Sequence, residues 1–373
     1  MVWIRCDGNA RIGAGHMMRC MAIAGELARL QGGTEEIRFV CADEESGALA
    51  ADNGFRSHVL GTDYRDMESE LPWWEQQLGK FSTARTTGPK ETLSVGAAGR
   101  GSGGAGRPAV LVDSYHVTDS YLQALGRRAY VIVMDDMGTH RYPGDCVVNY
   151  NAPAQETAYE ELYRGTGAKL LIGSRYVPLR RQFWDKGEKG QDHIRNAAEE
   201  PVRDVLITAG GGDSENIAGR ILERIYSREY FFHVVSGRFH PCFRELEALG
   251  RAHDNIRVHH DVKDMAALMG RCQAAVTAGG STIYELAALG VPFICFSCAE
   301  NQEALTEYVG RRQVGGFAGA WHKNREETLE TLGRLFGELA ACAKLRGGYS
   351  AAGRKMTDGK GAWRLACEIA DRT

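Results

Sequence analysis

The sequence has no long hydrophobic run, no excess of basic residues and no leader-like beginning. None of its apolar segments approaches the roughly 20 residues that a membrane-spanning helix needs, so we expect no transmembrane segment. Lysine and arginine number 45 against 48 aspartates and glutamates, and the net charge of −3 lacks the basic surplus of a nucleic-acid-binding protein. The chain starts in a strand-like segment with no basic region followed by an apolar one, so we expect no secretory signal and a cytoplasmic location.

Metal-binding patterns are also scarce. Of the ten cysteines, only Cys295 and Cys298 are spaced as Cys-x-x-Cys, and no second pair or histidine follows at zinc spacing. The Asp-x-Asp motif that holds a metal on a sugar nucleotide is absent. Asp135-Asp136 and His259-His260 are consecutive pairs, whose side chains point in different directions on a strand. We therefore expect no metal site and no cofactor.

The most informative motif lies within the first twenty residues. An apolar strand leads into a turn in which Gly13 and Gly15 allow tight bending and close approach of a ligand. A helix with an apolar stripe follows over residues 17–30, so His16 falls at or near its first turn, where the helix dipole favours a neutral imidazole. Arg19 shares a helix face with His16 and is placed to anchor a phosphate or a sugar substituent. We predict that His16 is a general base, with a capping or core histidine as the alternative.

Short β-branched runs alternate with helical patterns along most of the chain, which is typical of parallel sheets covered on both faces. We predict two βαβ domains, over residues 1–185 and 202–345, and a closing helical segment over 346–373. A flexible insertion is expected over 82–108, which is rich in glycine, serine and threonine, and a polar interdomain linker over 186–201. The expected strands cover residues 2–6, 37–41, 109–112, 130–134, 146–149, 169–172, 205–208, 231–235, 256–258, 274–277 and 293–296.

Two glycine-rich loops in the second half join a strand end to a helix start, where backbone amides and the helix dipole can bind an anion. The loop over residues 279–282 is the stronger candidate, with Glu285 one turn into the helix, where its carboxylate can accept hydrogen bonds from ribose hydroxyls. The other loop contains Gly211 and Gly212, and a simple tight turn explains it equally well. A capping box between Thr282 and Glu285 is a further alternative to ribose binding.

These motifs together resemble one known family. The loop over residues 279–282, with Gly290-Val291-Pro292 and Asn301-Gln302, is similar to the nucleotide half of GT-B sugar-nucleotide enzymes. The N-terminal Arg-x-Asp…Gly-x-Gly-His-x-x-Arg pattern makes the resemblance specific to one family among these enzymes. Three further segments do the same: Asp113-Ser114-Tyr115, Asp135-Asp136 and Gly173-Ser174-Arg175-Tyr176. The whole set looks like the UDP-2,4-diacetamido-2,4,6-trideoxy-β-L-altropyranose hydrolases of pseudaminic acid biosynthesis. The resemblance implies an α/β fold of the GT-B type, with two Rossmann-like βαβ domains whose parallel sheets face a central cleft.

The resemblance also implies roles for individual residues. His16 matches the catalytic base that activates a water. The positions that line the sugar are matched by Asp7, Arg19, Tyr115 and Arg180. The pair that faces the cleft is matched by Asn301 and Gln302. We expect Gly13, Gly15 and Asp113 to lie on the sugar side as well. On the nucleotide side, the resemblance implies that the diphosphate lies on Gly279, Gly280, Ser281 and Thr282, the ribose on Glu285 and the uracil beside Val262. We expect the loop of Gly211 and Gly212 to support the UDP as well.

The implied reaction is hydrolysis of the UDP-linked diacetamido sugar to UDP and free sugar, with inversion at the anomeric carbon. His16 would take a proton from the attacking water, and loop amides would stabilise the departing diphosphate. The expected partners are this small-molecule substrate and other enzymes of the sugar pathway, with no nucleic acid or membrane segment. Three alternatives stay open: an inverting GT-B glycosyltransferase, a nucleotide-sugar epimerase and a non-catalytic sugar-nucleotide-binding protein.

Overall fold

The computed structural model describes residues 1–9, 11–83, 107–189, 200–210, 213, 215–237 and 241–372. The chain forms two compact units. Unit 1 consists of Met1–Tyr150, Thr157–Ile172 and Trp363–Thr373, and unit 2 consists of Asn151–Glu156 and Gly173–Ala362. Most of the expected insertion over 82–108 and of the expected linker over 186–201 lies outside the described residues, as do Gly211 and Gly212.

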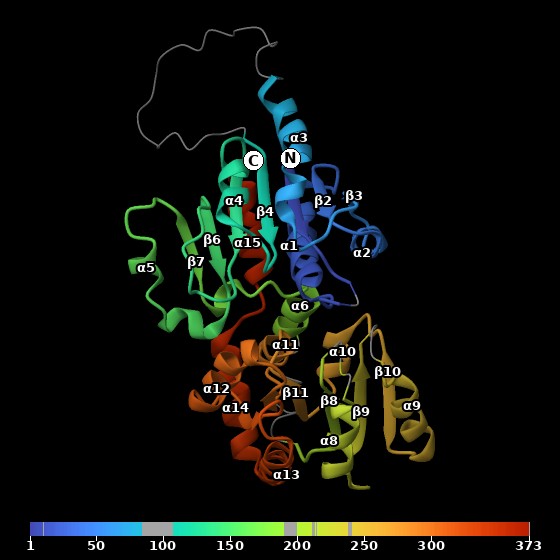
Figure 1. The fold of residues 1–373 in the computed structure, drawn as a ribbon. Coiled ribbons are helices and arrows are strands. Elements are labelled where there is room, and N and C mark those ends of the chain that lie inside the picture. Colours follow the sequence, from blue (N-terminus) through green and yellow to red (C-terminus); the bar gives the residue numbers. More distant parts are fainter. Residues whose placement is uncertain are drawn as a thin grey trace. The chain divides into compact units, whose positions relative to one another are not determined.

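Unit 1 is built on a seven-stranded parallel sheet in the order β3-β2-β1-β4-β5-β6-β7 (Figure 1). The strand order reverses between β1 and β4, and the carboxyl ends beside such a reversal are where open α/β sheets bind ligands. The strands are β1 (Val2–Cys6), β2 (Ile37–Cys41), β3 (Arg56–Val59), β4 (Ala109–Asp113), β5 (Tyr130–Met134), β6 (Cys146–Asn149) and β7 (Lys169–Ile172).

Helices cover both faces of this sheet because alternate strand residues point to opposite sides and both sets are apolar. On one face, α3 and α4 bury Trp74 and Tyr121 against Val110 and Val112. On the other face, α1 buries the predicted stripe that begins at Met17. The helices of unit 1 are α1 (Gly15–Gln31), α2 (Glu44–Asp52), α3 (Leu71–Thr83), α4 (Asp119–Gly126), α5 (Tyr159–Leu162) and α15 (Gly361–Ala370).

The closing helix α15 belongs to unit 1, although its residues are the last in the chain. Its apolar residues Leu365 and Ile369 pack beside Ile23 of α1 and the strand residues Leu111 and Ile132. Figure 1 shows α15, in red, among the strands of unit 1, with both chain ends in this unit. Within the expected closing segment over 346–373, the structure thus has the end of α14 and the helix α15, whose apolar residues are buried against the first sheet.

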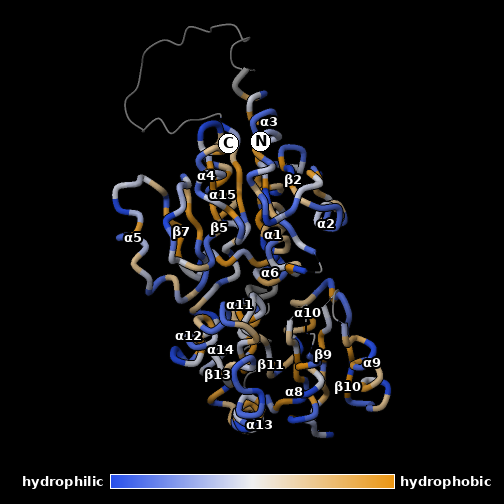
Figure 2. The backbone as a smooth tube through the Cα atoms, in the orientation of Figure 1, coloured by the Kyte–Doolittle hydropathy of each residue, from blue (hydrophilic) through white to orange (hydrophobic). Residues whose placement is uncertain are grey.

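Unit 2 contains a second parallel sheet, of six strands in the order β10-β9-β8-β11-β12-β13. Hydrophobic residues run along the strands of both sheets (Figure 2), as fully covered parallel strands require. The strands are β8 (Asp204–Thr208), β9 (Phe231–Ser236), β10 (Ile256–His260), β11 (Ala274–Ala278), β12 (Phe293–Ser297) and β13 (Gly316–Ala320). The helices are α6 (Arg181–Lys189), α8 (Ile217–Ile225), α9 (Phe243–Ala252), α10 (Met265–Met269), α11 (Thr282–Leu289), α12 (Glu303–Arg311), α13 (Arg325–Ala341) and α14 (Ala343–Met356).

The boundary between the units differs from the expected boundary at residue 185. Unit 2 takes up the chain from Gly173 onward, because α6 packs on α11 and α10. It also includes α14, which packs on α11. None of the helices formed by the described residues combines the length and the apolar character needed to cross a membrane.

Two edge strands, β3 and β13, escape prediction from the sequence. The residues of β3 read Arg-Ser-His-Val, and those of β13 read Gly-Phe-Ala-Gly-Ala, with a single large apolar side chain. Each strand has a neighbour on one side only, so its residues need not be β-branched or apolar on both faces. The edge strands β7 and β10 contain short apolar runs and are predicted, so the two misses follow from the missing pattern and not from the edge position alone.

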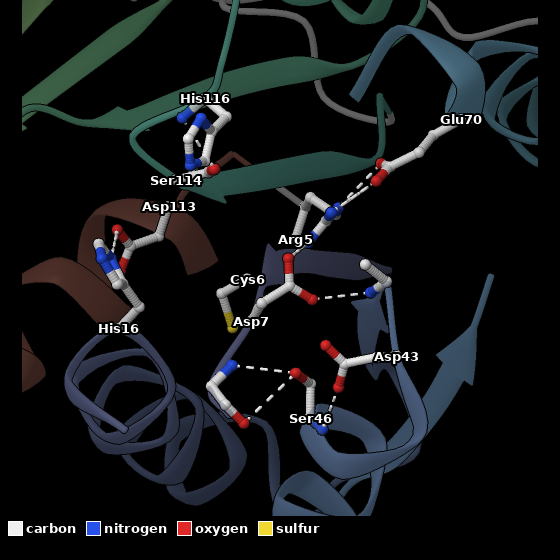
Figure 3. Close-up of polar contacts among 12 residues, drawn as sticks. Arg5, Cys6, Asp7, His16, Asp43, Ser46, Glu70, Asp113, Ser114 and His116 are labelled. Atoms are coloured by element: carbon white, nitrogen blue, oxygen red, sulfur yellow. Dashed lines mark hydrogen bonds and ion pairs between the residues drawn. The ribbon is translucent and has the colours of Figure 1, made fainter. Parts of the chain in front are cut away.

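A buried ion network ties β1 of unit 1 to the short 3-10 helix over Met67–Glu70. Arg5 is fully buried, and its Nε donates to both carboxylate oxygens of Glu70, at 3.0 and 2.8 Å. Tyr121 donates to the same carboxylate at 2.9 Å. Burial alone would lower the pKa of Arg5, but Glu70 and Asp7 reverse this effect and raise it. Figure 3 shows Arg5 between these two carboxylates.

Replacing Glu70 by alanine is expected to destabilise the protein by about 3–5 kcal/mol, the range for breaking a buried ion pair from one side. Urea unfolding monitored by circular dichroism measures this loss. The exposed Glu75 on α3 provides the control, since Glu75→Ala should change the free energy of unfolding by no more than about 0.5 kcal/mol. Equal losses in the two variants would show that the network adds no stability.

In unit 2, a chain of hydrogen bonds crosses three strands. Nε2 of the buried His233 lies 2.9 Å from Oδ1 of Asp204, and its Nδ1 lies 3.0 Å from Nε2 of His259. Burial, together with His233 and two nearby arginines, lowers the pKa of His259 to about 4. His259 thus acts as part of the sheet's polar structure, and its neighbour His260 packs instead on Phe243.

Because the pKa of His259 is depressed in the folded state, the unfolded chain binds this proton first as the pH falls. Stability from this group is therefore present above about pH 6.5 and is lost as the pH falls toward 4. We expect His259→Gln to flatten the decline of unfolding free energy between these pH values, measured by urea unfolding at each pH. The control is His260→Gln, and an unchanged slope in both variants would contradict the assignment.

Candidate active site

Polar residues of unit 1 gather where four neighbouring strands end. Asp113 ends β4, Asp136 follows β5 and Tyr150 follows β6, while His16 lies in the first turn of α1 after β1. Because these strands are parallel neighbours, their carboxyl ends share one edge of the sheet. That edge is where open α/β sheets bind ligands, so the position itself favours a functional site.

His16 and Asp113 form a hydrogen-bonded pair. Nδ1 of His16 lies 2.7 Å from Oδ1 of Asp113, and Figure 3 shows the ring turned toward the carboxylate. Burial by itself would raise the pKa of Asp113, but the charge of Arg19, together with His16 and the hydrogen bonds from both residues, outweighs burial and holds that pKa well below its usual range. An ionised carboxylate only accepts hydrogen bonds, so a neutral His16 carries its proton on Nδ1 and keeps a lone pair on Nε2. The pair can therefore present an oriented proton acceptor, as a general base must.

Arg19 is the centre of the charge network around this pair. Its Nε donates to Oδ2 of Asp113 at 2.6 Å, and its Nη1 and Nη2 donate to Asp136 at 3.0 and 2.9 Å. The hydroxyl of Tyr150 accepts a further hydrogen bond from Nη1. Nη2 also lies 2.9 Å from Nδ1 of His16, but both nitrogens are donors in this tautomer, so the Nδ1 proton goes to the carboxylate. In this structure, the Arg19 guanidinium thus hydrogen-bonds to Asp113, Asp136 and Tyr150 and orients the two carboxylates.

Tyr115 borders the imidazole of His16 on its open side. The two rings meet edge to face, with centroids 4.7 Å apart and an interplanar angle of 81°. Tyr115 is 57% exposed, which is high for a large aromatic side chain. An exposed ring beside a base is compatible with the predicted contact to a sugar.

Asp7, predicted on the sugar side, is instead buried beneath this edge. One carboxylate oxygen accepts a hydrogen bond from the amide of Ala42 at 2.7 Å, and the other pairs with Arg5 (Figure 3). Both oxygens are therefore engaged by the protein. Asp7 joins the loop after β1 to β2 and supports the turn that leads to His16.

The turn itself explains why the motif needs glycine. Gly13 has a φ of +76°, which L residues rarely adopt, and its amide donates to the carbonyl of Asn9 at 2.8 Å. Gly15 has an ordinary φ, but a Cβ there would meet no atom within 4 Å. Gly13 therefore closes the turn, whereas Gly15 leaves open space beside His16.

The structure separates the roles of the neighbouring Asp135 and Asp136. Asp135 accepts hydrogen bonds from the amides of Met137 and Gly138 and from Tyr159, so it shapes the loop after β5. Asp136 turns to Arg19 and belongs to the cluster around His16. Sequence reasoning expected no metal at this pair and did not single out Tyr150. The useful signal was that Asp136 and Tyr150 lie within two residues of the end of a predicted strand.

In unit 2, the loop over residues 279–282 joins β11 to α11 as predicted. A Cβ on Gly279 would lie 2.6 Å from Cγ2 of Thr306, so only glycine lets this loop pack on α12. Within the part of the chain that the structure describes, the amides of Ser281 and Thr282 donate to no protein acceptor. Two amides at the start of a helix are an anion-binding arrangement.

Glu285 does not form the alternative capping box. The residue at the N-cap of α11 is Ser281, which makes no side-chain capping hydrogen bond. The carboxylate of Glu285 is instead 3.6 Å from Nη2 of Arg180. Burial raises the pKa of Glu285, and the charge of Arg180 opposes this shift. Arg180 thus lies in unit 2, in the same unit as the loop over residues 279–282.

The remaining predicted residues of unit 2 differ in their exposure to solvent and in their hydrogen bonds to the protein. Gln302 uses its side-chain oxygen to accept from the amide of Cys298 at 2.8 Å, whereas Asn301 is exposed. Val262 is half-buried in the segment before α10. After β8, Asp213 accepts hydrogen bonds from the amides of Ile217 and Ala218 at the start of α8, so its carboxylate caps this helix.

Other features of the molecule do not compete with these sites. Among the described residues, no group of three or more His, Cys, Asp or Glu side chains is arranged to hold a metal ion. A cavity of about 710 Å³ lies beside the edge strand β13, lined by Tyr308, Phe317 and Tyr349 among others. None of the predicted site residues lines this cavity.

No protein-family model matches the chain. Among curated proteins, it is 22% identical to the UDP-2,4-diacetamido-2,4,6-trideoxy-β-L-altropyranose hydrolase of Campylobacter jejuni, over 83% of this chain and 96% of that protein. It is 21% identical to an uncharacterized protein of Methanocaldococcus jannaschii, over 81% of this chain but only 57% of that protein. It is 26% identical to the spore coat polysaccharide biosynthesis protein SpsG of Bacillus subtilis, over 45% of this chain and 50% of that protein.

Solved structures identify the fold. MurG of Acinetobacter baumannii matches 99% of this chain and 99% of its own, with 13% identity and a TM-score of 0.62. The spinosyn rhamnosyltransferase SpnG, solved with thymidine diphosphate, matches 99% of this chain and 96% of its own, with 14% identity and a TM-score of 0.55. The chain therefore has the GT-B fold of two Rossmann-like α/β units and is a distant homologue of a UDP-sugar hydrolase and of SpsG.

Proposed function

We propose that this protein hydrolyses a UDP-linked diacetamido-trideoxy sugar to UDP and free sugar, with inversion at the anomeric carbon. The observation that carries the proposal is the His16–Asp113 pair at the ligand-binding edge of unit 1. The similarity to the Campylobacter hydrolase, which extends over most of both chains, supports the choice of substrate, UDP-2,4-diacetamido-2,4,6-trideoxy-β-L-altropyranose.

In the proposed reaction, Nε2 of His16 takes a proton from a water as the water oxygen bonds to the anomeric carbon. The bond from that carbon to the diphosphate oxygen breaks, and its electron pair leaves with UDP. Asp113 stabilises the imidazolium that forms, because its carboxylate is ionised and lies on Nδ1. Attack opposite to the leaving group inverts the configuration.

Unit 2 is proposed to hold the nucleotide. The amides of Ser281 and Thr282 and the start of α11 would meet the negative charge that grows on the diphosphate as it leaves. Glu285 would accept hydrogen bonds from the ribose hydroxyls, and Val262 would border the uracil. Tyr115 of unit 1 would contact the sugar.

A second candidate is an inverting glycosyltransferase, which the fold favours because MurG and SpnG share it. The same base would then act on an acceptor hydroxyl in place of water. A purely sugar-nucleotide-binding protein would have no use for an oriented His–Asp pair, so this third possibility has the least support. The products distinguish the first two: free sugar without an acceptor indicates hydrolysis.

His16→Ala should slow UDP release from UDP-linked N-acetylated 6-deoxy sugars by roughly 10²–10⁴-fold, the usual contribution of a general base. The measurement is UDP and free sugar released without any acceptor, with His140→Ala as the control. His140 is 52% exposed and pairs with Asp119, outside the cluster around His16. No release by the wild type, or equal release by His16→Ala, would sink the hydrolase assignment.

Asp113→Asn should lower turnover while UDP still binds, because Asp113 belongs to unit 1 and the nucleotide loops belong to unit 2. An amide can donate to Nδ1 and so leave the proton on Nε2, which removes the proton acceptor; wrong-tautomer losses reach about 10⁴-fold. Steady-state rates measure the turnover, and calorimetric titration with UDP measures the binding. Asp119→Asn is the control, because Asp119 is exposed. A loss of UDP affinity with unchanged turnover would contradict the role.

A further inference from the structure

Arg180 occupies an unexpected place within unit 2. It immediately precedes α6, and its Nη2 lies 3.6 Å from Oε1 of Glu285 on α11. The guanidinium also lies over the ring of Phe183, 5.4 Å from the ring centroid. The side chain is held by these two contacts and is 28% exposed, so part of it reaches solvent.

The contact with Glu285 is loose for an ion pair. Charge-assisted hydrogen bonds between arginine and carboxylate are about 2.7–2.9 Å long, well below the 3.6 Å between Arg180 and Glu285. The guanidinium therefore has donors that a better-placed anion can take. Glu285 itself is 15% exposed and lies one turn into the helix, close along the chain to Ser281 and Thr282.

The neighbouring residue Gln182 links the same segment to the nucleotide side. Its side-chain oxygen accepts from the amide of Ala266 at 3.2 Å, and its side-chain nitrogen lies 3.4 Å from the carbonyl of Lys263. Val262, predicted beside the uracil, precedes these residues. The start of α6 thus contacts both the helix with the ribose carboxylate and the segment proposed for the base.

We propose that Arg180 binds the diphosphate of the nucleotide, in place of the sugar-side role that the sequence resemblance implies. The inference rests on the proposed nucleotide site of unit 2. Ribose hydroxyls take over the carboxylate of Glu285 when the nucleotide binds, and the guanidinium of Arg180 pairs with the diphosphate oxygens. Arginine suits this role because its planar fork of donors matches phosphate oxygens. The same contact stabilises the charge on departing UDP.

The test is calorimetric titration of the full chain with UDP, UMP and uridine. Arg180→Ala should weaken UDP binding by roughly 10- to 100-fold, the factor for hydrogen bonds to charged groups, with a much smaller loss for uridine. Arg180→Lys keeps the positive charge and is the conservative variant in case Arg180→Ala does not fold. Its affinity for UDP should lie between those of the wild type and Arg180→Ala. Arg181→Ala is the matched control, since Arg181 pairs with Asp185 and lies over Trp184.

Equal losses for UDP and uridine would overturn the inference, because Arg180 would then act only by supporting Glu285. Unchanged UDP affinity in Arg180→Ala would overturn it as well. If the wild type binds UDP but releases none from UDP-sugars, the hydrolase proposal fails while the role of Arg180 stands. If the wild type binds neither UDP nor uridine, both proposals fail.

Discussion

The ionised carboxylate of Asp113 is the group on which the polar cluster of unit 1 depends. It accepts hydrogen bonds from His16 and Arg19 at the end of the central strand β4, where it is almost fully buried. A buried charge is tolerated only when it is paired and hydrogen-bonded, so Arg19 is as necessary as the carboxylate itself. Arg19 in turn brings in Asp136 and Tyr150 from the two following strands. The polar groups at the ends of β4, β5 and β6 are thereby organised around one buried carboxylate.

The two units contribute different chemistry, and each contribution has its own physical basis. Unit 1 offers side chains, with an imidazole whose tautomer is set by a neighbouring carboxylate. Unit 2 offers the main chain, with amides at the start of α11 that are left without protein acceptors among the described residues. The proposed hydrolysis needs a base and a group that stabilises an anion, and these are the two kinds of group that the units offer.

Much of the fold and part of the site could be predicted from the sequence. Buried parallel strands such as Tyr130–Met134 are continuous apolar runs, and the glycine turn before His16 is a local signal. Edge strands such as β13 carry no such pattern. The burial of Asp7 beside Arg5 could not be read from the motif, because a carboxylate in a motif says nothing about which partner buries it and Arg5 lies far from Glu70 in the sequence.

The sequence by itself determined the class of fold, the presence of a histidine at a helix start, and the glycine loop over residues 279–282 that joins a strand to a helix. These features depend on short stretches of chain, whose apolar spacing and backbone freedom are local properties. Only the tertiary structure decided that Asp113 orients His16, that Asp136 and Tyr150 join Arg19, and that Arg180 meets Glu285. Such contacts join residues that are distant in the chain, and they exist only once sheets and helices have brought these residues together.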